Sequence, residues 1–316
     1  MKKLCSKLCV LCLLVLCIAG LALSAEAVEG NYNGNIHWEV EGGVLTVSGH
    51  GEMPDDTYPW VQLRNSIQQI VVSPGITSIG KNVFSNCTAA TKVILPESLK
   101  FIDKEAFAGC GKLETLVIPA NNLWKIEATA FDGCNRISNV YISDLQAWCK
   151  IDFGKLGGGN PLSKGAALYL DEQLVTRLKL PKGITLEAGY AFSGCTSLEG
   201  VVLPRGLKSI PGNCFSHCPN LRYVVIPASV KHISSGAFSV CDSLELIFYG
   251  GSKGQLKKVE VTQWNNSNLL SIPWIMWKQT LGLDFWTVTV NLAVVTACFF
   301  LEHRHRKYGY WFTYSF

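Results

Sequence analysis

The chain has 316 residues, of which 48% are hydrophobic and only 16% are charged, so it can bury a large core and is apolar for a soluble protein. Its net charge is +4, and removing residues 1–27, with three lysines and one glutamate, takes two of these positive charges away. A balance so close to neutral gives no reason to expect nucleic acid as a partner.

Residues 1–27 have the layout of a secretory signal peptide. Three lysines precede an apolar run at 8–23, and the small-residue sequence Ala25-Glu26-Ala27 follows it. This order of basic, apolar and cleavage regions predicts export, with cleavage after Ala27. The alternative is an uncleaved anchor helix formed by the same apolar run.

Residues 28–66 show no repeat, whereas the residues that follow do. Apolar and polar residues alternate over 36–40, Gly42-Gly43 provides a turn, and an apolar stretch returns at 44–47, which predicts a β-hairpin. The open end of a repeat array must be covered to stay soluble. We therefore interpret 28–66 as an N-terminal β cap, in which Pro59-Trp60 begins a short helix or turn that leads into the first repeat.

A Phe-x-x-Cys motif recurs six times between residues 84 and 241. Its phenylalanines are separated by 23, 24, 61, 23 and 23 residues, and they are Phe84, Phe107, Phe131, Phe192, Phe215 and Phe238. An aliphatic pair precedes five of the six phenylalanines, whereas Glu187 takes the second aliphatic position before Phe192. An apolar run that commonly ends in proline follows, as in Leu116-Val117-Ile118-Pro119. A repeat of this length predicts a solenoid, in which each coil covers the apolar side of the next.

Within each repeat we expect one strand, ended by the proline because proline has no amide donor for strand pairing. Stacked coils would then place these strands in one parallel sheet about 35 Å long over residues 67–250. The predicted strands are 70–72, 93–95, 116–118, 140–142, 178–180, 201–203, 224–226 and 247–249. Phenylalanine and cysteine lie one helical turn apart, so both can face inward.

This repeat resembles the BspA-type leucine-rich repeat family, also called leucine-rich repeat family 5, of bacterial surface proteins. The resemblance is carried by the Phe-x-x-Cys motif and the proline-ended apolar run, and it covers about residues 67–250. It implies an α/β solenoid with a parallel β-sheet on one face. It also implies an extracellular or surface-attached protein, since several members of the family are linked to adhesion to host matrix proteins or to other cells.

The chain contains thirteen cysteines, of which four lie in residues 1–27 and six belong to the repeats. Cysteines in the same position of adjacent coils would be about 4.8 Å apart, which is within reach of a disulfide. Their side chains point the same way, however, and that suits a disulfide poorly. We therefore predict a ladder of buried free thiols that act as small apolar residues.

The period is interrupted by an insert at 143–177. One or two helical turns are expected over 144–150, a flexible glycine-rich loop over 154–159, and a hairpin from Leu168-Tyr169-Leu170 through a turn at 171–173. The sequences Asn160-Pro161-Leu162 and Leu168-Tyr169-Leu170 match inserts of the resembling family.

The end of the chain changes character. Residues 251–272 are interpreted as a C-terminal cap, and 273–316 contain an apolar run at 285–301 with tryptophans before it and the basic cluster 303–307 after it. This order predicts a transmembrane helix at 285–301. Two alternatives stay open, namely a buried terminal helix and a non-native tail from a shifted reading frame, which the aromatic-rich residues 308–316 favour.

No motif indicates catalysis, a cofactor or a metal. Nucleophile-elbow and zinc-protease motifs are missing from the sequence, and the glycines at 154–159 lack the Lys-Ser/Thr of a phosphate-binding loop. Glu52, Asp55 and Asp56 lack the spacing of a calcium loop. His217 lies between two cysteines that occupy core positions of the repeat, so we do not expect a zinc site there.

The outward positions of the predicted strands are mostly apolar, on a face that should meet water. An exposed apolar patch of this kind often marks a binding site, and aromatic side chains dominate binding energy. The predicted contact residues are Ile94, Val117, Tyr141, Val202, Tyr223, Val225 and Phe248. The alternative is that valine and isoleucine stand there only because they favour strands.

These features predict an exported, non-enzymatic leucine-rich repeat protein that binds a protein or glycan at the cell surface through its curved sheet face. It would be extracellular, or held at the membrane by residues 285–301. The alternatives are a targeting module for an enzyme that acts on glycans or peptides, and a structural spacer.

Overall fold

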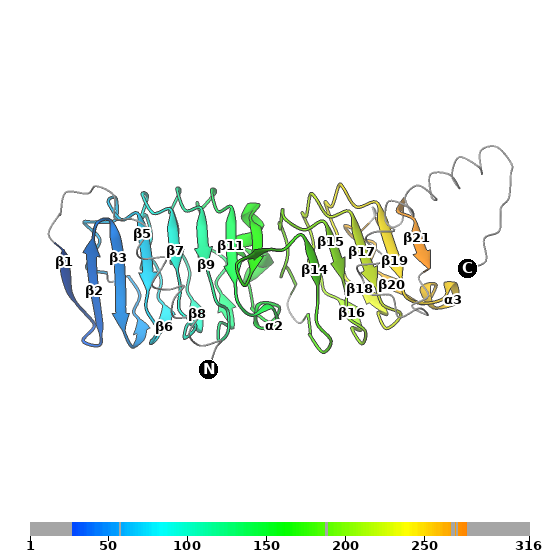
Figure 1. Ribbon diagram of the computed structural model, residues 1–316, viewed down its shortest axis with the longest axis horizontal. Helices are drawn as coiled ribbons and strands as arrows, with labels where there is room; N and C mark the ends of the chain where they lie inside the picture. Colours follow the sequence, from blue (N-terminus) through cyan, green and yellow to red (C-terminus); the bar gives the residue numbers. More distant parts are fainter. Residues whose placement is uncertain (1–26, 57, 187–188, 267–268, 270, 277–316) are drawn as a thin grey trace.

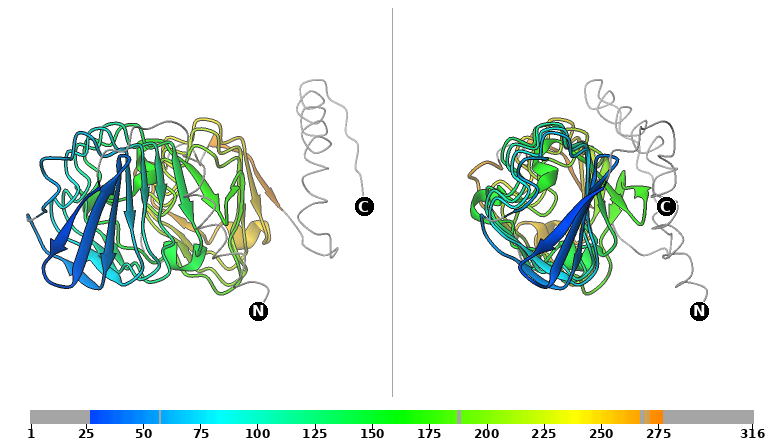
Figure 2. Two further views of the ribbon diagram at one scale, coloured as in Figure 1. Left: turned by 60° about the vertical axis from the view of Figure 1, so that its left-hand side comes forward. Right: turned by 90° about the vertical axis from the view of Figure 1, so that its left-hand side faces the viewer.

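The computed structural model describes residues 27–56, 58–186, 189–266, 269 and 271–276. They form a solenoid whose coils follow one another along the long axis (Figure 1) and superpose when viewed down that axis (Figure 2, right). Residues 1–26 of the predicted signal peptide and the predicted membrane helix at 285–301 lie outside the described residues. Within the described part of the chain, no helix is long and apolar enough to cross a membrane.

The first half of the solenoid carries a sheet of nine strands and, on another side of the coils, a sheet of four short strands. In their order across the larger sheet, the strands are β1 (Val28–Tyr32), β2 (Ile36–Glu41), β3 (Val44–Gly49), β5 (Gln69–Val72), β7 (Lys92–Ile94), β9 (Thr115–Val117), β11 (Asn139–Ile142), β12 (Ala167–Leu170) and β13 (Gln173–Leu174). The smaller sheet runs β10 (Lys125–Ile126), β8 (Phe101–Ile102), β6 (Ile76–Ile79) and β4 (Gly51–Met53).

The second half repeats this arrangement with five and three strands (Figure 1). The larger sheet runs β14 (Arg177–Lys179), β15 (Gly200–Val202), β17 (Tyr223–Ile226), β19 (Leu246–Tyr249) and β21 (Trp274–Met276). The smaller sheet runs β16 (Ser209–Ile210), β18 (His232–Ile233) and β20 (Glu260–Val261). The helices described are short, and they are α2 (Leu145–Trp148), η1 (Lys155–Gly157), η2 (Pro161–Lys164) and α3 (Lys253–Leu256).

The repeat motif builds the core as predicted. All six repeat phenylalanines are fully buried. Their rings stack coil upon coil, with centroids 5.3 to 5.5 Å apart, from Phe84 to Phe131 and again from Phe192 to Phe238. The Phe-x-x-Cys segment itself is a tight turn rather than a helix. The fold is therefore a parallel β-solenoid of the leucine-rich repeat type with little helix.

The prediction of a ladder of free thiols is confirmed, because all eight described cysteines are buried and unpaired. In four coils the thiol donates a hydrogen bond, 3.0 to 3.2 Å long, to the carbonyl oxygen of the phenylalanine in the preceding coil. The donors are Cys110, Cys134, Cys218 and Cys241. Cysteine suits this position because it is small and apolar and can still satisfy a buried carbonyl group.

The prediction of one continuous sheet of eight strands was wrong. Strand β12 of the insert pairs in parallel with β11, and β13 then turns back antiparallel and ends the first sheet. Strand β14 begins the second sheet. The core nevertheless runs on through this seam, where the indole nitrogen of Trp148 donates to the carbonyl oxygen of Ala191 at 2.8 Å. The amide of Asn160 donates to the carbonyl oxygen of Tyr190 at 2.6 Å.

Helical turns and a hairpin are present in the insert as predicted, in α2 and in β12 with β13. The glycine-rich loop, by contrast, is packed against the preceding coil. A Cβ atom on Gly159 would lie 2.4 Å from the carbonyl oxygen of Ile126. The glycines are thus explained by close approach of two backbones, which leaves no room for a side chain.

At both ends of the solenoid, strand pairing of the repeat type extends beyond the residues that the sequence indicated. The predicted hairpin is present, but its second strand β3 also pairs in parallel with β5. Trp60 stacks on Phe84 at 5.5 Å and takes the position of a repeat phenylalanine. The predicted cap thus joins the solenoid directly, through the pairing of β3 and the stacking of Trp60. At the other end, β20 and β21 continue the two sheets in parallel.

Candidate interaction surface

The outer face of the nine-stranded sheet carries a row of six apolar and aromatic residues in register across its strands. All six are partly or well exposed, and they are Val71, Ile94, Val117, Tyr141, Tyr169 and Leu174. We call this set the sheet row. At a strand spacing of about 4.8 Å, six positions extend about 24 Å along the solenoid axis.

Strand alternation explains the sheet row. Residues on either side of its first four members, Val71, Ile94, Val117 and Tyr141, point inward and are buried; Leu116 and Val140, for example, are fully buried in the core. The next outward positions on the same strands are polar in four successive coils, and they are Gln69, Lys92, Thr115 and Asn139. The sheet row is thus a narrow apolar strip beside a polar one.

The aromatic part of the sheet row consists of two tyrosines. The rings of Tyr141 and Tyr169 stack with centroids 4.3 Å apart and an interplanar angle of 17°. Partial burial raises the pKa of Tyr141, and the neighbouring Tyr169 and the carboxylate of Glu172 add to this effect. The two rings therefore form a stacked aromatic platform in register with Leu174, which is 49% exposed.

The sequence singled out Tyr141 but missed Tyr169 and Leu174. The sequence predicts a hairpin for their strands but does not predict that these strands belong to the sheet. The parallel register of 139–142 with 167–170 brings Tyr169 beside Tyr141. Aligning Leu168-Tyr169-Leu170 with Val140-Tyr141-Ile142 would have revealed the pair, since both segments have the same pattern.

The predicted contact residues of the second half stand on a different sheet. Val202, Val225 and Phe248 are in register there with Lys179 at one end and Ile275 at the other. Val202 and Val225 are partly exposed. The structure thus divides the predicted contact residues between two sheets instead of joining them in one surface.

Two of the predicted aromatic anchors do not meet water, which corrects the expectation that they are exposed. Tyr223 is 5% exposed and Phe248 is 2% exposed. Their rings meet edge to face at 6.5 Å, and Leu246, Val225 and Ile275 pack around them. Gly200 leaves room for the Tyr223 ring to lie over the sheet, because a Cβ atom there would collide with the Tyr223 ring carbon Cζ.

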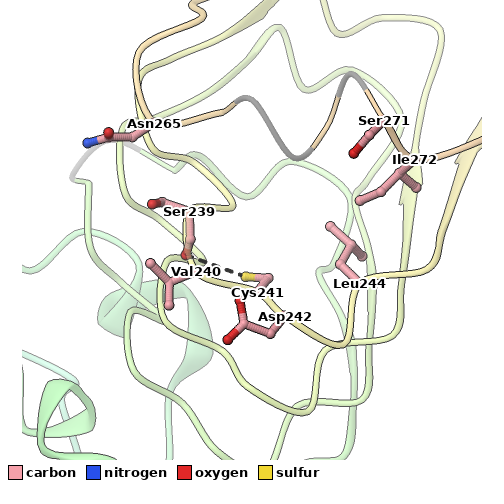
Figure 3. Close-up of a pocket in the computed structure, with 8 residues that line it drawn as sticks. All are labelled: Ser239, Val240, Cys241, Asp242, Leu244, Asn265, Ser271 and Ile272. Atoms are coloured by element: carbon pink, nitrogen blue, oxygen red, sulfur yellow. Dashed lines mark hydrogen bonds between the residues drawn. The ribbon is translucent and has the colours of Figure 1, made fainter.

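A pocket of about 510 Å³ lies beside the last Phe-x-x-Cys turn (Figure 3). Its lining comes from residues 239–242 and from Leu244, Asn265, Ser271 and Ile272. The thiol of Cys241 is not available to a ligand, because it is 3% exposed and donates to the carbonyl oxygens of Phe215 and Ser239. Asp242 is the carboxylate among these lining residues, and no histidine or second acid accompanies it.

The titratable side chains of the described residues form no group of three or more histidines, cysteines, aspartates or glutamates that would hold a metal ion.

Comparison with known proteins places this fold in a family. Residues 62–150 and 167–279 match the sequence profile described as the BspA type Leucine rich repeat region, in six copies. A comparison with curated proteins found no match. The unmatched residues 151–166 contain the glycine-rich loop at the seam.

Several solved structures are similar. A leucine-rich repeat protein from Eubacterium ventriosum is 19% identical, with 72% of this chain and 73% of that chain covered and a TM-score of 0.36. A leucine rich cell surface protein from Faecalibacterium prausnitzii is 17% identical, with coverages of 77% and 98% and a TM-score of 0.25. A leucine-rich repeat protein from Bacteroides ovatus is 18% identical, with 78% of each chain covered and a TM-score of 0.31. With its profile match extending over more than half of its length, the chain belongs to the BspA-type leucine-rich repeat family.

Proposed function

We propose that this chain is an exported, non-enzymatic surface protein that binds a protein partner through the sheet row. Family membership and the layout of residues 1–27 support export to the cell surface. The observation that carries the proposal is the aligned, partly exposed sheet row with its stacked Tyr141–Tyr169 pair. Stacked tyrosines are suited to this role because they offer large contact area at low entropic cost.

The shape of the sheet row favours a partner segment that lies along the solenoid axis. The row is one residue wide, and its members recur about every 4.8 Å. An amphipathic α-helix presents an apolar residue about every 5 Å along its stripe, because residues three and four apart share one face. The two spacings nearly match over six coils, whereas alternate residues of a β-strand recur at about 6.7 Å.

Charge agrees with this choice of partner. Lys92 of the polar strip lies beside Ile94, and Glu172 lies near the aromatic end. A partner helix with an apolar stripe and charges of both signs beside it would place opposite charges near Lys92 and Glu172. Such complementarity contributes to specificity and to the association rate more than to affinity.

The test is binding of the purified chain to a panel of immobilised extracellular-matrix proteins, measured by surface plasmon resonance. The double variant Tyr141→Ser/Tyr169→Ser is expected to lose at least about tenfold in affinity for a bound matrix protein, because truncation of an aromatic hot-spot residue costs about 2 kcal/mol or more. Since both residues are partly exposed, the variant should still fold, which circular dichroism checks.

The matched control is Val202→Ser/Val225→Ser, which changes two outward residues of the other large sheet. This control is expected to bind as the unchanged chain does. If the tyrosine variant also retains full affinity, or if the valine variant alone loses it, the sheet row is not the binding surface.

A further inference from the structure

A second exposed aromatic pair lies on the smaller sheet of the first half, away from the sheet row. Phe101 is in β8, and Trp124 comes immediately before β10. Their rings stack with centroids 5.6 Å apart and an interplanar angle of 14°. Trp124 is 58% exposed, and Phe101 is partly exposed. The stack holds the indole in place while most of its surface remains in contact with water.

The fold does not require an aromatic residue at this position. Each coil hydrogen-bonds to the preceding one here, as Trp124 does to Lys100 at 3.0 Å and Lys100 to Thr77 at 2.7 Å, through backbone groups. In the second half the same bond joins Lys231 to Lys208 at 2.8 Å. The equivalent positions are thus threonine or lysine, as expected on a solvated face, and the exposed tryptophan needs another reason.

Charged side chains lie next to the aromatic pair. Lys125 is next in sequence to Trp124 and in register with Phe101, and its ammonium group lies 2.6 Å from a carboxylate oxygen of Glu127. The carboxylate of Glu127 raises the pKa of Lys125, and the charges of Asp152 and Asp103 add to this. Charged groups of both signs therefore lie beside a flat apolar surface.

The size of the pair decides what kind of ligand it fits. Two aromatic side chains offer at most about 150–250 Å² each. A stable protein interface needs about 800 Å² on each partner, with a contiguous apolar centre. Lys125 flanks Phe101 on one side and Ser78 on the other, so the pair does not extend into a contiguous apolar centre of that size. A small ring with one apolar face and polar edges matches both the area and the surroundings.

We propose that Phe101 and Trp124 form a carbohydrate-binding platform that takes a neutral hexopyranose unit of a glycan chain. The C–H face of the sugar stacks on the indole ring, and its hydroxyl groups hydrogen-bond to the charged side chains around the platform. No covalent step is involved. The platform is independent of the sheet row, because its strands belong to a different sheet.

The test uses the full chain with cellohexaose, chitohexaose and maltohexaose as separate probes in isothermal titration calorimetry. At least one probe is expected to bind with Kd below 1 mM, and Trp124→Ala should weaken that binding at least about tenfold, as loss of a stacking aromatic does for other flat ligands. Trp124→Tyr keeps a flat ring and should stay within about threefold of the unchanged chain.

The matched control is Trp264→Ala, which removes another exposed tryptophan, 74% exposed, from the C-terminal end of the solenoid. It should leave oligosaccharide binding unchanged, as should Tyr141→Ser/Tyr169→Ser, so that the platform and the sheet row are tested separately. The proposal is overturned if none of the three probes binds below 1 mM, or if Trp124→Ala binds them as tightly as the unchanged chain. Loss of matrix-protein binding in Trp124→Ala with unchanged oligosaccharide binding would also overturn it.

Discussion

At the scale of single residues, the turns of the solenoid depend on positions with positive φ. One such position lies two residues after the repeat phenylalanine. It is occupied by Asn86, Gly109, Gly133, Gly194, His217 and Val240. Glycine and asparagine tolerate this backbone conformation, whereas a β-branched residue is strained in it. Val240, with φ of 54° and a side chain 49% exposed, is therefore a strained residue beside the C-terminal pocket.

Replacing Val240 by asparagine or glycine should relieve this strain. We expect the free energy of unfolding to rise by about 1 kcal/mol, because a left-handed conformation costs a side-chain-bearing residue about that much. Urea denaturation followed by circular dichroism measures the change. As a control, Val202→Gly in the extended strand β15 should lower the stability. A lower denaturation midpoint for Val240→Asn and Val240→Gly alike would contradict the assignment of strain.

At the scale of elements, the two large sheets treat their outer faces differently. The outer face of the nine-stranded sheet keeps its aromatic pair partly exposed. On the five-stranded sheet, Tyr223 and Phe248 are buried in a small cluster of their own. Gly200 contributes to this difference, because its missing side chain gives the Tyr223 ring its place against the sheet.

Gly200→Ala should displace the Tyr223 ring and lower the free energy of unfolding by about 1–3 kcal/mol, as overpacking does. In a Tyr223→Ala background the clash is gone, and the same glycine-to-alanine change should be neutral or slightly stabilising, because glycine weakens a strand. Denaturation of the four proteins in this cycle gives the coupling energy. A cost for Gly200→Ala that is the same in both backgrounds would show that the ring does not depend on the glycine.

At the scale of the whole molecule, two stacks of coils meet at the insert. In such arrays the stability of the whole depends on the interfaces between neighbours. Trp148 is fully buried at this seam and donates its indole proton to the carbonyl oxygen of Ala191. Because sheet pairing stops between β13 and β14, side chains of this kind connect the two stacks.

Trp148→Ala should uncouple the two stacks. We expect a loss of about 3–5 kcal/mol from the cavity and the missing hydrogen bond, and two unfolding transitions where the unchanged chain shows one. Differential scanning calorimetry distinguishes one transition from two. Trp148→Phe, which keeps most of the ring volume, should retain a single transition at a lower temperature. A single transition in Trp148→Ala would mean that other contacts suffice to couple the stacks.

Features set by spacing along the chain were evident from the sequence alone. They include the solenoid, the inward phenylalanines and thiols such as Phe107 and Cys110, and the hairpins at both 36–49 and 167–174. Each depends on residues a few positions apart, or on a period that repeats the same local pattern, so tertiary context had little to add.

Features that depend on which strands become neighbours were decided only by the tertiary structure. The spacing of the motif does not show that β13 ends one sheet, that Tyr169 stacks on Tyr141, or that Trp60 takes the place of a phenylalanine. Nor does it show that Gly200 lets Tyr223 bury its ring while Trp124 stays exposed. The physical reason is that register across the insert and the exposure of an outward side chain depend on what packs beside it, and those neighbours come from distant parts of the chain.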